Sequence, residues 1–115
     1  MVRQINHWID GKVEIGESRH YGDVFDPSTG MVQAKVSLAN AAEVNKAVKS
    51  SLKSFETWSA TPPLKRARVM FKFRELLESN LKDLAKIVTS EHGKILTDAE
   101  GSIIRGMEVV EFSAG

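Results

Sequence analysis

The sequence of 115 residues contains no cysteine. This absence excludes disulfides, thiolate catalysis and cysteine metal sites from these residues. The three histidines, His7, His20 and His92, are scattered, and no paired acidic cluster lies beside them. Metal sites need several such ligands brought together, so we expect no metal centre in this chain.

Two further features are missing: a long apolar run and an excess of charge of one sign. No segment is apolar for long enough to span a bilayer, and the N-terminus lacks the composition of a signal or transit peptide. The 16 basic and 15 acidic residues leave a net charge of +1, which does not indicate nucleic acid or an anionic membrane as a partner. We predict a cytoplasmic protein, or a mature chain whose targeting segment was removed.

The first third of the sequence predicts strands over about residues 5–36. Asp10-Gly11 suits a type I′ turn and predicts a β-hairpin over Ile5 to Val13. Residues 16–22 are polar and are expected to form a loop. A short strand at Val24-Phe25 should end in the turn 26–30, and the alternation that follows predicts a half-buried strand up to Val36.

From Asn40 the apolar period changes from two to 3.6 residues, which predicts about four helices over residues 40–114. Asn40 and Glu43 have the spacing of a capping box. Thr61-Pro62 predicts an N-cap followed by a proline at the first helical position. Asn80 is expected to interrupt the helical run.

The segment from Glu91 onward predicts one helix end and one helix start. Gly93 suits the left-handed residue that follows a helix, and Lys94 would place a cation beside the last carbonyls. Thr97 and Glu100 have a second capping-box spacing, so the final helix is expected to begin there.

The final helix is expected to be apolar on two faces, with Val109 and Phe112 opposite its main apolar stripe. That stripe consists of Ala99, Ile103, Met107 and Val110. A helix that is apolar nearly all round is a buried helix. The preceding segments can cover one face, so we expect the cover for the other to lie outside these 115 residues. The aromatic residues expected to anchor the core are Trp8, Trp58, Phe71 and Phe73.

Four runs of sequence, in this order, resemble the N-terminal portion of the aldehyde dehydrogenase family: WIDGK, DPSTG with its alternating strand, AAEVNKAVKSSLKSFETWS, and RARVMFKFRELLESNLKDLAKIVTSEHGK. The turn begins with Asp26, where the family has asparagine. The further run DAEGSIIRGMEVVEF resembles the CoA-acylating branch that acts on methylmalonate and malonate semialdehyde. The resemblance covers nearly the whole chain from about Trp8 onward.

The pattern predicts an α+β fragment, with an N-terminal hairpin and strands followed by about four helices. The resemblance implies that it is part of a larger α/β Rossmann-type fold. Residues 1–115 would be the N-terminal part of the NAD-binding domain region. NAD would be the cofactor, bound outside this chain, with coenzyme A as co-substrate and a semialdehyde as the small-molecule substrate. A homo-oligomer, dimer or tetramer, is expected for the full-length protein.

The implied reaction begins when a cysteine thiolate attacks the aldehyde, and hydride then passes to NAD. Coenzyme A takes the resulting acyl group, and the substrate carboxylate leaves as CO2. No residue here matches the nucleophile, the general base, the oxyanion asparagine or the cofactor loop of that family. We therefore expect no catalytic or cofactor-binding residue in this chain, and no activity from the chain alone.

One site residue follows from the resemblance: Arg105, in the run EGSIIRG, would bind the substrate carboxylate. A guanidinium can hold a carboxylate through two parallel hydrogen bonds. It would need to be half-buried to discriminate against uncharged aldehydes, and a second cation is expected from outside the chain. The residues alone leave another interpretation open, an ion pair with Glu108 or Asp98.

Two alternatives to this function stay open. The chain could be a stand-alone helical interaction module, or it could belong to another aldehyde dehydrogenase branch. The two apolar faces of residues 97–113 favour the enzyme, because a free-standing module should have a polar outer face there.

Overall fold

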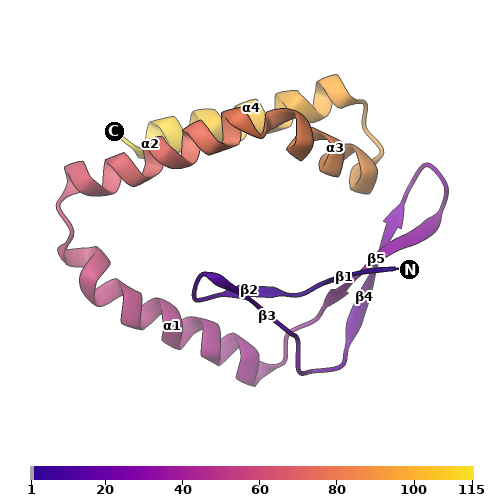
Figure 1. Cartoon of the computed structure of the whole chain (residues 1–115), viewed down its shortest axis with the longest axis horizontal. Coiled ribbons are helices and arrows are strands. Elements are labelled where there is room, and N and C mark those ends of the chain that lie inside the picture. Colours follow the sequence, from indigo (N-terminus) through magenta and orange to yellow (C-terminus); the bar gives the residue numbers. More distant parts are fainter. Residues whose placement is uncertain (1) are drawn as a thin grey trace. The chain divides into compact units, whose positions relative to one another are not determined.

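The computed structural model describes residues 2–115, in which five strands precede four helices (Figure 1). The predicted order of strands and then about four helices is confirmed. The chain divides into two compact units, an N-terminal unit that ends at Ala60 and a C-terminal unit over Thr61–Gly115.

The N-terminal unit contains a three-stranded sheet whose central strand is β5 (Met31–Ser37). β5 pairs antiparallel with β4 (Tyr21–Asp26) and parallel with β1 (Arg3–Ile5). Ala34 in β5 is fully buried. The predicted strand after the turn is confirmed, whereas β4 begins at Tyr21, so the expected loop ends before that residue. Pairing with β5 extends β4 towards the N-terminus as far as Tyr21. The polarity of these residues does not predict that pairing, because β5 lies further along the chain.

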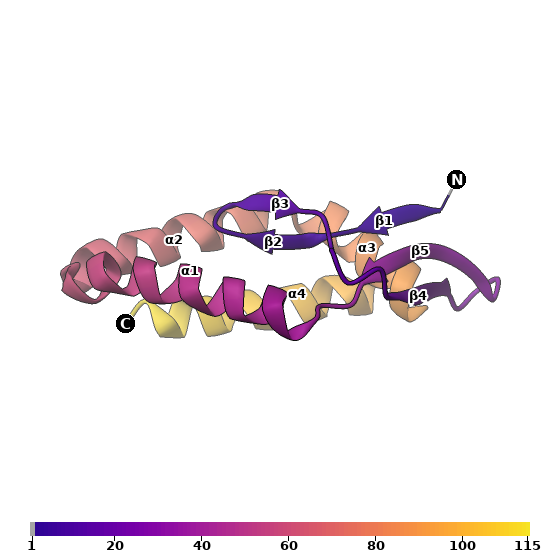
Figure 2. The same ribbon diagram turned by 90° about the horizontal axis from the view of Figure 1, so that it is seen from below.

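The hairpin consists of β2 (His7–Ile9) and β3 (Lys12–Glu14), and it continues from β1 (Figure 2). Asp10 and Gly11 have φ values of 55° and 72°, which confirms the predicted type I′ turn. The prediction was wrong to place Ile5 in this hairpin. Ile5 belongs to β1 and lies opposite Val36, a partner far away in the sequence.

The turn predicted at residues 26–30 is confirmed. The Gly30 amide donates to the Asp26 carbonyl at 2.7 Å, and the Ser28 amide donates to Asp26 Oδ1 at 2.9 Å. Gly30 has a φ of 73°, which a residue with a side chain rarely adopts. Asp26 therefore closes the turn with both its main chain and its side chain.

Helix α1 (Ala41–Ala60) begins with the predicted capping box. The Glu43 amide donates to Asn40 Oδ1 at 2.9 Å, and the Asn40 amide donates to Glu43 Oε2 at 2.8 Å. Each side chain thus pairs one of the backbone N–H groups that a helix start leaves without a partner.

The C-terminal unit contains α2 (Pro63–Ser79), α3 (Leu81–His92) and α4 (Leu96–Ser113). α4 packs against both other helices and runs in the opposite direction to α2 (Figure 1). Its predicted main stripe is confirmed, since the residues buried on α4 are Ala99, Met107 and Val110. Asn80 separates α2 from α3 as predicted, and Gly93 ends α3 with a φ of 85°.

The starts of α2 and α4 differ from the predictions. Pro62, not Thr61, is the N-cap of α2, with ψ of 145°, and the helix begins at Pro63. A residue that precedes proline is disfavoured in the helical region, so Pro63 keeps Pro62 extended. α4 begins at Leu96, and no side chain caps it. The Ile95 carbonyl accepts the first helical hydrogen bond, from the Ala99 amide at 3.0 Å, so Thr97 already lies inside the helix and caps nothing.

The expected aromatic core anchors are exposed, which corrects that prediction. The exposed fractions are 71% for Trp8, 42% for Trp58, 54% for Phe71 and 48% for Phe73. The second apolar face of α4 is also open, with Val109 65% and Phe112 88% exposed. The periodicity was right about which faces are apolar, but residues 2–115 bury chiefly small side chains.

Candidate functional site

The predicted substrate-binding residue, Arg105, lies on α4 with its side chain exposed, not half-buried as the carboxylate role requires. Its Nη2 donates to Ser102 Oγ at 3.2 Å, one turn towards the helix N-terminus. Within residues 2–115 Arg105 forms no ion pair with Glu108 or Asp98. The alternative interpretation, an ion pair with one of these two carboxylates, is therefore not observed among the described residues.

A second cation reaches the same hydroxyl. Lys94 was expected to lie beside the last carbonyls of α3, but its Nζ donates to Ser102 Oγ at 2.8 Å. The αL turn at Gly93 directs the chain from α3 into α4, so the half-buried Lys94 side chain extends along α4. Ser102 Oγ also donates to the Asp98 carbonyl at 3.2 Å.

The Ser102 hydroxyl therefore uses its full bonding capacity. A hydroxyl has one proton to donate and two lone pairs that accept. Here the proton goes to the helix carbonyl, and the two cations occupy the acceptor side. A Cβ at Gly101 would lie 3.5 Å from Arg105 Nη1, so the guanidinium lies against this glycine. Ser102 and Gly101 together define where the charged group sits.

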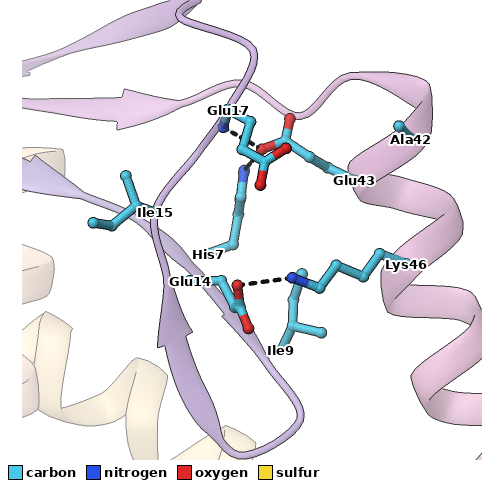
Figure 3. A pocket seen from close by; sticks show the side chains of 8 residues that line it. All are labelled: His7, Ile9, Glu14, Ile15, Glu17, Ala42, Glu43 and Lys46. Carbon is cyan, nitrogen blue, oxygen red and sulfur yellow. Dashed lines mark hydrogen bonds and ion pairs between the residues drawn. The ribbon is translucent and has the colours of Figure 1, made fainter.

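The N-terminal unit contains a separate pocket of about 220 Å³ (Figure 3). Its centre is Glu43, which is buried although it carries a charge. Glu43 Oε1 accepts the Glu17 amide at 2.6 Å, and Oε2 accepts the Asn40 amide. These two donors, that of Asn40 foremost, hold the pKa of Glu43 below its ordinary value. His7 Nε2 points at the same carboxylate from 3.3 Å but makes no hydrogen bond there.

An ion pair between Glu14 and Lys46 closes the other end of this pocket at 2.9 Å (Figure 3). The hydrogen bond from Lys46 lowers the pKa of Glu14, and the same bond raises the pKa of Lys46. The pocket thus joins the hairpin and the following loop to the first turns of α1 through the contacts of Glu43 and the Glu14–Lys46 pair. Both Glu43 oxygens are already held by backbone donors, so the arrangement suits a structural junction better than a general base.

The described residues do not provide a metal or dinucleotide site. Residues 2–115 contain no group of three metal-ligating side chains. Their parallel strand pair, β1 and β5, is connected through further strands, and no glycine-rich loop leads from a strand into a helix. A dinucleotide pyrophosphate needs such a loop and helix N-terminus, so the residues present here do not fit one. None of the described helices is long and apolar enough to cross a membrane.

Comparison with known proteins places the chain in a family. Residues 15–115 match the sequence profile described as "Aldehyde dehydrogenase family". The chain belongs to the aldehyde dehydrogenase family. The resemblance carried by its sequence runs is thereby confirmed.

Several relatives of the chain are named as semialdehyde dehydrogenases. Malonate-semialdehyde dehydrogenase of Bacillus pumilus is 40% identical over 114 residues, which are 99% of this chain and 24% of that protein. The Aedes aegypti protein named probable methylmalonate-semialdehyde/malonate-semialdehyde dehydrogenase (acylating), mitochondrial, is 44% identical over 104 residues, 90% of this chain and 20% of that protein. The chain thus spans about a quarter or less of the length of these relatives.

Solved structures of the family contain the same arrangement of strands and helices. A Sinorhizobium meliloti protein assigned as a methylmalonate-semialdehyde dehydrogenase, crystallised with NAD, matches with a TM-score of 0.98 and 44% identity. That match covers 100% of this chain and 23% of the other. Methylmalonate-semialdehyde dehydrogenase of Oceanimonas doudoroffii matches with a TM-score of 0.95 and 41% identity, over 99% of this chain and 23% of that one. The predicted fold class, a part of a larger aldehyde dehydrogenase fold, is confirmed.

Lys94, Ser102 and Arg105 meet at the Ser102 hydroxyl, and sequence reasoning identified only Arg105 as a site residue. Ser102 precedes Arg105 by three positions, a spacing that places two side chains on one helix face and could have identified it. Lys94 gave no comparable signal. Its contact depends on the direction of the chain after Gly93, and an equally local partner, the end of α3, was available to it.

Proposed function

We propose that this chain is the N-terminal part of an NAD-dependent, CoA-acylating dehydrogenase of methylmalonate or malonate semialdehyde. The observation that carries the proposal is the 44% identity and 0.98 TM-score to the Sinorhizobium meliloti protein, which was crystallised with NAD. The acylating activity in the name of the Aedes aegypti relative supports coenzyme A as the acyl acceptor. The full-length protein would be a cytoplasmic homo-oligomer.

Within that enzyme, residues 1–115 would belong to the N-terminal part of the NAD-binding domain region. The nicotinamide would accept the hydride of the aldehyde, while the nucleophilic thiol must come from outside this chain, which has no cysteine. For malonate semialdehyde the balance is substrate anion, coenzyme A thiol and NAD+ giving acetyl-CoA, CO2 and NADH. The carboxylate thus stays on the substrate until it leaves as CO2, so a residue that binds it also orients the substrate.

The part of this chemistry proposed for the chain is recognition of the carboxylate by Arg105. A guanidinium has five N–H donors, and Arg105 uses Nη2 on Ser102. Among residues 2–115 no carboxylate forms an ion pair with it, so donors are available for a planar two-oxygen partner. The exposure of Arg105 in this chain fits a surface that is completed by other parts of the enzyme.

Arg105→Ala in the full-length protein tests this proposal. We expect kcat/KM for the carboxylated semialdehyde to fall by a factor corresponding to roughly 2–4 kcal/mol, because a desolvated charge-assisted pair is lost. The value for propanal, which has no carboxylate, should change by less than about twofold. Arg68→Ala, which removes an exposed arginine from α2, is the matched control and should affect neither substrate.

Equal losses on both substrates would remove the carboxylate role of Arg105. If the wild-type enzyme prefers propanal to the semialdehyde, the chain belongs to another branch of the family. That conclusion does not depend on the effect of Arg105→Ala.

A further inference from the structure

The β2–β3 hairpin leaves the three-stranded sheet and returns to it beside one residue, the buried Ser37 at the end of β5. Ser37 Oγ donates to Oδ1 of Asn6, which joins β1 to β2, at 3.4 Å. On the other side Gly16 packs so closely that a Cβ there would lie 2.6 Å from Ser37 Cβ. Both ends of the hairpin are therefore fixed at the same point, while residues 7–14 between them form a separate two-stranded sheet.

Titratable side chains join this hairpin to α1 (Figure 3). His7 Nε2 lies 3.3 Å from Glu43 Oε1, and Lys46 Nζ donates to Glu14 Oε2 at 2.9 Å. His7 and Glu14 lie opposite each other in the hairpin ladder, and Glu43 and Lys46 are three positions apart on α1. The two contacts are therefore neighbours, and the carboxylate belongs to the helix in one and to the hairpin in the other.

Apolar side chains add little to this junction. Trp8 and Val13 lie opposite each other on the other face of the hairpin, where they are 71% and 61% exposed. Ile15 lines the pocket of about 220 Å³ but is 73% exposed. An ion pair near the surface contributes less than a buried apolar contact, so the hairpin is held on α1 weakly. A two-stranded hairpin is only marginally stable in water, so its ladder should open readily once it leaves the helix.

We propose that residues 7–14 form a lid over this pocket, hinged at Ser37 and latched to α1 by the two charged contacts. The lid opens as one unit, so both contacts break together while α1 and the sheet of β1, β4 and β5 stay folded. Opening exposes the Glu43 carboxylate to water, although the residue is only 7% exposed with the lid shut. Glu43 keeps the amides of Glu17 and Asn40, because neither residue belongs to the lid. This movement does not depend on the proposed activity.

Amide hydrogen exchange of the full-length protein, resolved to single residues, tests the lid. Lys46→Gln removes the charge on the helix side of the latch. The amides of β2 and β3 should then exchange about two- to fivefold faster, the factor expected for loss of an exposed ion pair. The amides of Glu17 and Asn40 should keep their wild-type rates. Raising the salt concentration from about 0.1 M to about 1 M shortens the Debye length from about 10 Å to about 3 Å, which should speed the hairpin amides more in wild type than in the variant.

Glu14→Gln removes the same contact from the hairpin side and keeps the lid testable if Lys46→Gln does not fold. Because both substitutions break one ion pair, the double variant should exchange no faster than the faster single variant. Lys35→Gln is the matched control, since it removes an exposed lysine that pairs with Asp23 at 2.8 Å within the three-stranded sheet. This variant should leave the exchange of the hairpin amides unchanged.

Three results would overturn the lid. Hairpin amides that keep their wild-type rates in both Lys46→Gln and Glu14→Gln would show that the ion pair is no latch. Faster exchange in β3 alone would show that one strand frays and that the hairpin does not move as a unit. An equal acceleration at the Glu17 amide would show that the chain moves beyond Gly16, so the hinge is not at Ser37. None of these results bears on the selectivity of Arg105→Ala, so the proposed function is tested separately.

Discussion

Replacing Asn40 with alanine should lower the free energy of unfolding by about 1 kcal/mol, within a range of about 0.5–2 kcal/mol. Asn40 Oδ1 accepts the Glu43 amide at 2.9 Å, and alanine offers no acceptor. The reciprocal bond, from the Asn40 amide to Glu43 Oε2, involves only the backbone of Asn40 and should survive. The loss therefore corresponds to one half of the capping box. Because that bond is partly buried, water replaces it poorly, and the low end of the range is not expected.

The assay is urea denaturation followed by far-ultraviolet circular dichroism, with amide hydrogen exchange in the first turn of α1 as a local readout. Asn40→Asp should be nearly neutral, and Asn40→Gly should cost only a few tenths of a kcal/mol. Asn45→Ala, at an exposed site on the same helix, is the control and should not destabilise, since alanine is the better helix former. If Asn40→Ala and Asn45→Ala behave alike, the capping argument is refuted.

Two further predictions concern pH and backbone conformation. Because backbone donors lower the pKa of Glu43 in the folded state, its stabilising effect is present above about pH 4.5 and is lost as the pH falls through the lower folded-state pKa. Acid titration of the unfolding free energy should thus fall less steeply for Glu43→Gln than for wild type; equal slopes would contradict this. Gly93→Ala, at a φ of 85°, should destabilise by about 1 kcal/mol in thermal unfolding, whereas Gly106→Ala inside α4 should stabilise by up to about 1 kcal/mol. The opposite order would refute the assignment of Gly93 as a helix end.

Features fixed by neighbours in the sequence were predictable. Asp10-Gly11 adopts its turn, Asn40 caps α1, and Gly93 ends α3, because each depends on φ angles and hydrogen bonds within a few residues. The position of β1 was not predictable in this way. Its parallel partner, β5, is separated from it in the sequence by the β2–β3 hairpin and by β4. No local pattern specifies that pairing.

Errors at helix starts have a different, local origin. Thr61 and Thr97 are both acceptable N-caps by residue type. Pro63 imposes an extended conformation on Pro62, which shifts the start of α2 by a local rule that outranks capping preference. At α4 the helix already begins at Leu96, without a side-chain cap, so the capping-box spacing was only a coincidence of composition.

Only part of the candidate site was predictable, because some of its contacts join residues close in the sequence and others depend on the path of the backbone. Arg105 followed from likeness to a family, and its bond to Ser102 lies within one turn. Lys94 meets them only because Gly93 turns the chain so that α4 follows α3 closely. Contacts of this kind depend on the path of the backbone, which composition and period do not specify.

The apolar faces show why the core was harder to predict than the helices. Hydrophobic period reports which side of a helix avoids water, but it does not report whether a partner surface lies within the same chain. In residues 2–115 the closest packing occurs at Ala34, Ala85 and Ala99, which are fully buried, whereas Phe112 is 88% exposed. Alanine lets backbones approach closely, so it is buried between two packed elements, whereas a large aromatic needs a further layer to cover it. Val109 is 65% exposed on the same side of α4, and a group of exposed apolar residues on a helix whose other face is packed is typical of a contact surface. In the proposed dehydrogenase, that surface would pack against the rest of the enzyme.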